Sequence, residues 1–217
     1  MIRYDNTEKG IFLRRLNRFV AEVEINGAVT RAHVRNTGRC TAVISSGAEV
    51  SLQKSSDPNR ATPYTLIAVN TPQYGWVNLD SLAPNKMAGE WLKGQGFVNI
   101  RPEYRFGDSR IDFYSEKNGE KYLVEVKGCT LESGGVGLFP DAPTSRGAKH
   151  LRELASAAAK DYRPVIAFVI MLNGIREVRP NSAIDPEFAE EYSRAMQAGV
   201  STQFITCRCT AEEVYLT

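Results

Sequence analysis

Residues Val165–Leu172 are the feature that most constrains the fold, because they form an uninterrupted apolar run, VIAFVIML. A strand with one solvated face alternates apolar and polar residues, so a strand that is apolar at every position must be covered on both faces. Helices on the two sides of a parallel sheet provide that cover. The run is far shorter than the ~20 apolar residues of a membrane helix. We therefore expect the central strand of an α/β sheet.

Capping and turn signals predict further elements around this strand. Pro84 can open a helix, and Asp185 followed by Pro186 is typical of the cap and first residue of another helix, which Gly199 ends. The expected order is a helix from residue 84, strands near 97–106, 110–116 and 121–127, a helix over 145–160, the apolar strand, the helix from 186 to 198, and a strand over 202–209. This order predicts a C-terminal α/β domain over residues 84–217.

Residues 1–83 follow another pattern, in which short β-rich runs alternate with turn signals. Phe19 and every second residue up to Ile25 are apolar, which predicts a strand with one buried face. The pair Asn26-Gly27 then predicts a tight hairpin that sets Glu22 opposite Arg31. Many short strands separated by turns are typical of a small barrel or sandwich. An OB-type barrel of about this size is a common platform for single-stranded nucleic acid, although a fold does not fix a function. We place the domain boundary near residue 83.

A second hairpin signal, Asn118-Gly119, fixes the register of the two strands around it. A two-residue turn sets Asp112 opposite Glu125, and side chains directly opposite in an antiparallel pair share a face. Lys127 lies two residues beyond Glu125 and shares that face too. The other face is then apolar and carries Ile111, Phe113, Val124 and Val126. A one-residue slip of the register would turn these apolar side chains outward. We therefore expect the three charged side chains to converge.

Two like charges set directly opposite each other are destabilising unless a positive charge intervenes. Mg²⁺, or Mn²⁺ in its place, suits Asp112 and Glu125 because hard cations take carboxylate oxygens and need few protein ligands when phosphate supplies others. The Lys127 ammonium can then stabilise charge on a scissile phosphate. The alternative is a solvated strand face on which Lys127 neutralises both acids. The first interpretation predicts metal-dependent phosphodiester cleavage by Asp112, Glu125 and Lys127.

Basic residues in two segments are candidate DNA contacts. The net charge of +2 does not by itself indicate a nucleic-acid partner. Arg14, Arg15 and Arg18 cluster in the N-terminal domain, however, and Arg146 and Lys149 lie near the start of the expected 145–160 helix. Backbone N–H groups at a helix N-terminus favour anions, so a phosphate contact is plausible there. A solvated face is the alternative for each of these residues.

Three aromatic residues and one histidine carry weaker functional signals. Tyr64, Tyr74 and Trp76 could stack on bases in an OB-type groove, although a buried core is the commoner place for such residues. His150 could act as a general base, but an isolated histidine on a helix is more often a packing or hydrogen-bonding residue. We assign none of the four a site role from the sequence.

The cysteines and the start of the chain indicate a cytoplasmic protein. Cysteines occur at 40, 129, 207 and 209, without the paired spacing of a zinc site and too sparsely for a disulfide scaffold. The first residues, MIRYDNTEK, lack the apolar core of a signal peptide. We expect cytoplasmic localisation and no membrane partner. The sequence does not indicate an oligomeric state.

Motifs along the chain resemble, in the right order, those of the sugar fermentation stimulation protein A family. The segments that carry the resemblance are Arg15–Phe19 (RLNRF), Asn36–Gly38 (NTG), Ser109–Phe113 (SRIDF), Leu123–Lys127 (LVEVK), Gly128–Leu131 (GCTL), Phe139–Ala142 (FPDA) and Thr144–Leu154 (TSRGAKHLREL). The resemblance implies an N-terminal OB-like domain, a C-terminal domain similar to restriction endonucleases of the PD-(D/E)XK nuclease superfamily, and DNA binding without marked sequence preference. It also implies a link to the regulation of sugar use.

The same resemblance implies roles for individual residues. Asp112, Glu125 and Lys127 match the D and E-x-K positions of the nuclease superfamily, with Asp112 and Glu125 as metal ligands. Glu90 or Glu103 could be a further acid. DNA, single- or double-stranded, is the implied partner, and Mg²⁺ or Mn²⁺ the implied cofactor.

Two functions remain open from the sequence. One is a Mg²⁺-dependent nuclease whose N-terminal domain grips the strand while the hairpin hydrolyses it. The other is a DNA-binding regulatory protein that keeps a nuclease-like fold without turnover. A sugar-metabolising enzyme finds no support, because no nucleotide-binding glycine loop or sugar-phosphate site is evident.

Overall fold

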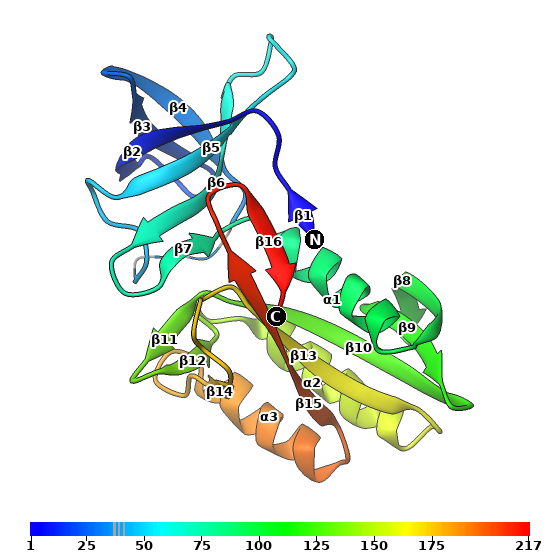
Figure 1. The fold of residues 1–217 in the computed structure, drawn as a ribbon. Helices are drawn as coiled ribbons and strands as arrows, with labels where there is room; N and C mark the ends of the chain where they lie inside the picture. The colour runs from blue at the N-terminus through cyan, green and yellow to red at the C-terminus, as the bar shows by residue number, and fades with distance from the viewer. Residues whose placement is uncertain (37, 39, 41) are drawn as a thin grey trace.

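The computed structural model describes residues 1–36, 38, 40 and 42–217, which fold into two domains (Figure 1). Residue 37 of the Asn36–Gly38 segment lies outside the described residues. Six strands build the N-terminal domain: β2 (Thr7–Arg15), β3 (Val20–Ile25), β4 (Ala28–Val34), β5 (Glu49–Lys54), β6 (Tyr64–Thr71) and β7 (Gly75–Asn78). They pair in the order β4-β3-β2-β5-β6-β7, and an additional pairing of β4 with β6 closes the first five into a barrel. The expected OB domain is confirmed.

The hairpin at Asn26-Gly27 shows how the barrel's sequence sets its register. Both turn residues have positive φ, as a tight hairpin requires, and Glu22 pairs with Arg31 as predicted. Ala21, Val23 and Ile25 of β3 are buried, but Phe19, expected on the same face, is 49% exposed. The prediction for Phe19 is wrong because β3 begins at Val20, so the alternation does not extend to the preceding loop.

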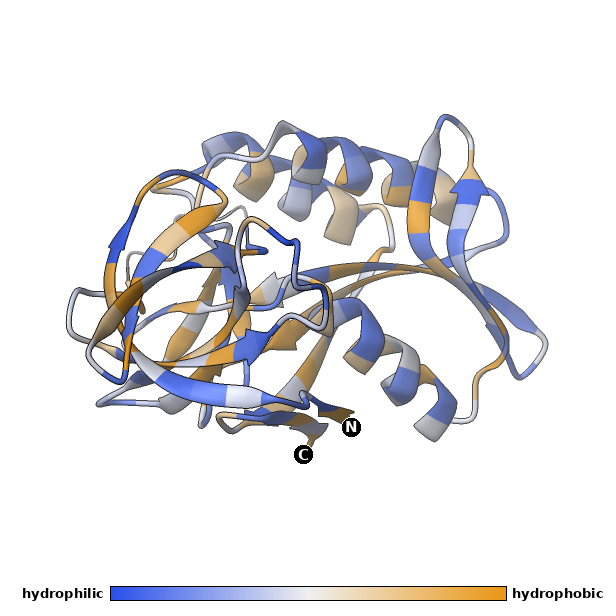
Figure 2. Ribbon diagram, turned by 90° about the horizontal axis from the view of Figure 1, so that it is seen from above, coloured by the Kyte–Doolittle hydropathy of each residue, from blue (hydrophilic) through white to orange (hydrophobic). Residues whose placement is uncertain are grey.

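The C-terminal domain is a seven-stranded sheet covered by helices on both faces (Figures 1 and 2). Its strand order is β1-β16-β15-β13-β10-β9-β8, with β1 (Ile2–Arg3), β8 (Val98–Phe106), β9 (Ser109–Lys117), β10 (Glu120–Cys129), β13 (Arg163–Ile170), β15 (Ser201–Cys209) and β16 (Glu213–Leu216). Helix α1 (Ala83–Gly94) packs on one face, and α2 (Ser145–Ala158) and α3 (Pro186–Gln197) pack on the other. None of the helices in the described residues is long and apolar enough to cross a membrane.

Strand β13 is the predicted central strand. It pairs in parallel with β10 on one side and β15 on the other. Ile166 and Phe168 are fully buried towards α2 and α3, while Ala167 and Val169 are fully buried towards α1. The prediction of a central strand from the apolar run is confirmed, since both faces of β13 are covered.

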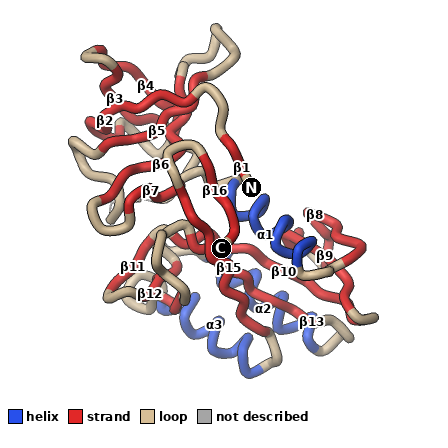
Figure 3. Tube along the Cα trace, in the orientation of Figure 1, coloured by secondary structure: helices blue, strands red, loops and turns tan. Residues whose placement is uncertain are grey.

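Two features of the fold were not expected from the sequence. Strand β1 pairs with β16 and so adds residues 2–3 to the C-terminal sheet, which differs from the assignment of all of residues 1–83 to the first domain. A separate small sheet is formed by β11 (Leu131–Ser133), β12 (Val136–Phe139) and β14 (Val178–Pro180). As expected, every helix in the described residues belongs to the C-terminal domain, while the described part of the N-terminal domain is strand and loop (Figure 3).

Hydrogen bonds tie the two domains together at their junction. The buried carboxylate of Asp80 accepts bonds from Arg35 of the barrel at 3.0 and 3.1 Å and from the Tyr4 hydroxyl, next to β1, at 3.1 Å. On the far side of the junction, Asn173 donates to the carbonyl oxygens of Tyr74 at 2.8 Å and Trp76 at 3.3 Å. Both contacts set the barrel in a fixed position over the sheet.

Candidate functional site

The predicted hairpin register is confirmed by the pairing of β9 with β10. Asn118 and Gly119 have positive φ, and the ladder runs from the Lys117–Glu120 pair to the Phe113–Val124 pair. It stops one pair before Asp112 and Glu125 would face each other. The Asp112 carboxylate instead accepts a hydrogen bond from the backbone N–H of Val126 at 2.8 Å. Asp112 thus takes the place of a backbone partner where the two strands separate.

The apolar face of the hairpin is partly as predicted. Phe113, Val124 and Val126 pack together against α1, but Ile111 packs in the other cluster, on the side of α2. The prediction for Ile111 is wrong because β9 leaves the ladder beyond Phe113, so strict alternation across the pair no longer applies there.

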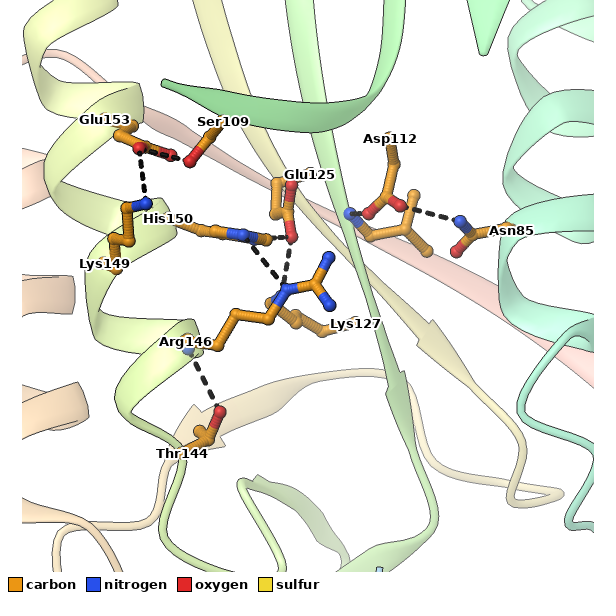
Figure 4. Close-up of polar contacts among 12 residues, drawn as sticks. Asn85, Ser109, Asp112, Glu125, Lys127, Thr144, Arg146, Lys149, His150 and Glu153 are labelled. Carbon is orange, nitrogen blue, oxygen red and sulfur yellow. Dashed lines mark hydrogen bonds and ion pairs between the residues drawn. The ribbon is translucent and has the colours of Figure 1, made fainter. Parts of the chain in front are cut away.

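Glu125 lies at the centre of the polar site (Figure 4). The residue is 2% exposed, and its Oε1 atom lies 2.7 Å from Lys127 Nζ and also contacts His150 Nδ1 from α2. Its Oε2 atom is buried and has no hydrogen-bond partner among the described residues. Burying a carboxylate oxygen without a partner costs free energy, so this atom marks a place where a ligand would be accommodated.

His150 is oriented by a second contact on α2. The Nε atom of Arg146 donates to His150 Nε2 at 3.3 Å. Because a guanidinium can only donate, Nε2 must carry the lone pair, and the ring hydrogen then lies on Nδ1, facing Glu125. His150 therefore holds Glu125 by a directed hydrogen bond. A faint signal of this role is present in the sequence, as the i, i+4 spacing of Arg146 and His150 on one helix face.

The two carboxylates of the site have opposite pKa shifts. Burial, followed by the negative charge of Glu125, raises the pKa of Asp112, although Val126 N–H, Lys127 and Asn85 oppose the shift. Burial would also raise the pKa of Glu125, but the contacts of Lys127 and His150 outweigh it and lower that pKa. Glu125 is thus held as a carboxylate, and its charge disfavours ionisation of Asp112.

Asp112 and Glu125 have different side-chain partners, so the expected convergence of three side chains is only partly realised. Asp112 Oδ1 accepts from Asn85 of α1 at 2.7 Å, whereas Glu125 and Lys127 contact each other on the side of α2 (Figure 4). Within the described ranges, no three His, Cys, Asp or Glu side chains are grouped so that they could hold a metal ion. Asp112 and Glu125 stay the metal ligands predicted from the sequence.

Glu90 and Glu103, the other candidate acids, line a cavity of about 730 Å³ on the side of α1 that also contains Asp112. Glu103 is occupied by an ion pair with Arg110 at 3.2 Å.

The three arginines of the barrel that were predicted to contact DNA have different surroundings. Arg14 is exposed and pairs with Glu22 at 2.7 Å. Arg15 donates to the carbonyl oxygens of Arg18, Asn36 and Gly38 at 2.6, 2.6 and 2.9 Å, so it fastens neighbouring loops together. Arg18 is exposed. Arg14 and Arg18 are thus presented to solvent, while the hydrogen bonds of Arg15 give it a structural task.

The basic residues of α2 lie along the site. Arg146 points towards Glu125 and His150, and Lys149 is half-exposed with its Nζ 3.7 Å from Glu153 (Figure 4). Glu153 also accepts a hydrogen bond from Ser109 at the start of β9. The polar face of α2, which carries Arg146, Lys149, His150 and Glu153, therefore forms one wall of the site.

Two family models match the chain. The model described as "SfsA N-terminal OB domain" covers residues 13–79, and the one described as "Sugar fermentation stimulation protein RE domain" covers residues 82–213. Relatives named sugar fermentation stimulation protein homolog include one from Desulfitobacterium hafniense, 43% identical over 216 residues, covering 98% of this chain and 94% of the relative. Another, from Ruminiclostridium cellulolyticum, is 39% identical over 219 residues, covering 99% and 96%.

A solved structure is similar over the same length. It is described as Pyrococcus furiosus SfsA in complex with Ca²⁺, and it superposes with a TM-score of 0.86 at 28% sequence identity, covering 99% of this chain and 95% of that one.

Proposed function

Because the chain belongs to the sugar fermentation stimulation protein family, we propose that it binds DNA with little sequence preference and holds a divalent cation, Mg²⁺ or Mn²⁺, at the β9–β10 hairpin. One observation carries the metal part of this proposal. The Oε2 atom of Glu125 is buried without a hydrogen-bond partner in the part of the chain that the structure describes. A bound cation would offset the free-energy cost of that unsatisfied oxygen.

The residues of the hairpin fit a hard cation. Asp112 and Glu125 offer carboxylate oxygens, and water or a phosphate can fill the remaining positions around Mg²⁺. Burial and then the charge of Glu125 raise the pKa of Asp112, and a cation at the site would oppose the repulsion between the two carboxylates. The archaeal relative is described with Ca²⁺, which takes the same class of oxygen ligand.

Basic side chains on both domains support the DNA part. Arg14 and Arg18 are exposed on the barrel, and Arg146 and Lys149 stand on the first turns of α2, which Thr144 caps through a hydrogen bond to Gly147 N–H. Contacts from such groups go to phosphate oxygens, which every sequence presents alike. This agrees with binding that is largely indifferent to sequence.

A second candidate function, hydrolysis of phosphodiester bonds, is favoured by the position of Lys127. Its side chain is 14% exposed, and its ammonium is held beside Glu125 rather than in bulk solvent. When bound, Mg²⁺ would lower the pKa of a water and neutralise charge on the phosphate. Lys127 would stabilise the negative charge that develops on the phosphoryl oxygens. His150 and Arg146 would keep Glu125 in its orientation.

The two parts of the proposal can be tested on one preparation. Binding of fluorescent DNA in EDTA should weaken steeply as salt rises, because neutralised phosphates release counterions. Cleavage is then assayed with Mg²⁺ and with Mn²⁺ for wild type, Asp112→Ala, Lys127→Ala and the exposed-loop control Asp108→Ala. We expect wild type and the control variant to cleave DNA, and Asp112→Ala and Lys127→Ala to leave it intact. Cleavage that persists in Asp112→Ala and Lys127→Ala would overturn the assignment of the site, and absence of DNA binding would overturn the function.

A cytoplasmic location and a role in the regulation of sugar use belong to the same proposal. Its partner would be DNA, and the four cysteines are free and buried, which suits a reducing compartment. Cell fractionation with an antibody to the protein tests the location.

A further inference from the structure

The loop between β2 and β3 exposes two apolar side chains, Leu16 at 40% and Phe19 at 49%. Among the residues that the structure describes, Phe19 is the one aromatic side chain in the exposed class. Tyr64, Tyr74 and Trp76 are instead partly buried and packed against the apolar clusters. A large ring left in water at the tip of a charged loop is a candidate contact surface.

Hydrogen bonds hold this loop in a defined shape. Phe19 N–H donates to Asn17 Oδ1 at 2.8 Å, and Leu16 N–H donates to Val20 O at 2.8 Å. The Arg15 guanidinium fastens the same loop from below through Arg18 O at 2.6 Å. The exposure of Phe19 is therefore built into the loop, and a ligand that contacts the ring would not have to order it first.

Arg18 connects Phe19 to a cleft between the domains. Its guanidinium carbon lies 5.8 Å from the centre of the Phe19 ring, and its side chain also lines a cleft of about 310 Å³. The opposite wall of the cleft includes Gly128, which follows Lys127 on β10, and Thr144, which caps α2 two residues before Arg146. The cleft thus leads from the barrel loop to the hairpin.

The charges around the cleft favour a polyanion at its two ends. Arg18 lines the barrel end. At the hairpin end, Lys127 precedes the lining residue Gly128, and Arg146 lies two residues after the lining residue Thr144. Of the acidic residues that line the cleft, Asp80 is neutralised by Arg35 at 3.0 Å. The other acidic residue, Asp141, packs against Gly38 of the barrel. A Cβ atom added to Gly38 would lie 2.3 Å from Oδ2 of Asp141.

We propose that the β2–β3 loop binds single-stranded nucleic acid, with an unpaired base stacked on Phe19 and a phosphate at Arg18, and directs the strand through the cleft to the β9–β10 hairpin. In an intact duplex the bases stack on one another, so a side-chain ring must first pay for unstacking, whereas the face of an unpaired base is open to it. The arginine beside the ring adds a cationic contact to the same nucleotide. This inference rests on the proposed function, since it names the form of nucleic acid that the site receives.

The test compares single- and double-stranded oligonucleotides of the same sequence by fluorescence anisotropy, in EDTA so that the probe stays intact. Wild type should bind the single strand more tightly. Phe19→Ala should weaken single-strand binding by about 5- to 150-fold, the effect typical of one lost base–aromatic stack, and leave duplex binding unchanged. Phe19→Trp should retain the single-strand affinity. The matched control Val29→Ala removes another exposed apolar side chain of the barrel, 61% exposed on β4, and should change neither.

Each outcome separates this inference from the proposed function. Binding of duplex and single strand with equal affinity, or equal effects of Phe19→Ala and Val29→Ala, would overturn the stacking site while DNA binding stands. Binding of neither form by wild type would overturn both. Thermal unfolding of the Phe19 variants checks that any lost binding is not lost folding, and with Phe19 half-exposed we expect little change in Tm.

Discussion

Asp80 and Glu125 are both buried carboxylates, one at the domain junction and one at the hairpin, yet their surroundings differ. Both oxygens of Asp80 accept bonds, from Tyr4, from Arg35 and from the backbone N–H of Leu82. Glu125 is bonded through Oε1 alone, and no described residue hydrogen-bonds its Oε2. A saturated carboxylate stabilises the fold, whereas an unsaturated one is retained at a cost in stability that a function has to explain.

The comparison predicts that isosteric variants at the two positions have separate effects, one on the stability of the fold and the other on the stabilisation by a bound cation. Asp80→Asn leaves the Arg35 guanidinium without its countercharge, so we expect a loss of about 3 kcal/mol in the free energy of unfolding, measured with urea. It should keep the stabilisation by Mn²⁺ or Ca²⁺, which at 100 times Kd amounts to about 2.7 kcal/mol. Glu125→Gln should abolish that cation-dependent shift in Tm.

Loss of the cation effect in Asp80→Asn, or its survival in Glu125→Gln, would remove the distinction between a structural and a functional carboxylate. Asp108→Asn, which changes an exposed loop residue, serves as the control for both measurements.

The functional role of Glu125 can also be tested at His150, which contacts this proposed metal ligand and not the proposed cation itself. Residues that orient a metal ligand through a hydrogen bond typically contribute 10- to 100-fold to metal affinity. We therefore expect His150→Ala to weaken Mn²⁺ binding by about 10- to 100-fold in calorimetry. His150→Asn, whose side-chain amide can still donate towards Glu125, should restore part of the loss. His33→Ala, which alters the other histidine, should bind Mn²⁺ as wild type does.

Equal affinities of His150→Ala and His33→Ala would show that the Nδ1 contact does not position Glu125. Failure of the Asn variant to recover any affinity would point to packing of the ring instead, since the asparagine replaces the donor but not the ring's volume.

His150 also shows where sequence reasoning stops. The β9–β10 register was predictable because Asn118-Gly119 fixes the turn and the apolar residues fix the faces, and both are local signals. The central strand β13 was predictable because a single uninterrupted run of apolar residues indicates burial on both faces of the strand. The contact of His150 with Glu125 joins a helix to a strand 25 residues away, and only the packing of α2 on the sheet creates it.

Other differences between expectation and structure have the same physical origin. The two-residue strand β1 has no local pattern, and its pairing with β16 joins the two ends of the sequence. Arg15 carries the same charge as Arg14 and Arg18, but three backbone carbonyls from neighbouring loops surround it, so charge alone could not tell it apart. Ile111 and Phe19 depart from alternation where a ladder or a strand ends. Local periodicity predicts elements, while tertiary contacts assign the tasks of single side chains.

Asp112 should give the smallest effect, and its sign is the informative part. Its pKa is raised in the folded protein, so the folded state holds the proton more tightly than the unfolded state does, and ionised Asp112 destabilises the fold as pH rises through that raised pKa.

Without metal, Asp112→Asn should therefore raise Tm at pH 7, because the amide still accepts from Val126 N–H and the repulsion with Glu125 is gone. The gain should vanish below about pH 3, beneath the ordinary pKa of an aspartate, where wild-type Asp112 is itself protonated in both the folded and the unfolded state. Saturating Mn²⁺ should reverse the order at pH 7, since only wild type keeps both carboxylates. Scans of Tm against pH, in EDTA and in Mn²⁺, measure both effects, and a variant less stable than wild type in EDTA at pH 7 would show that Asp112, like Asp80, serves the fold.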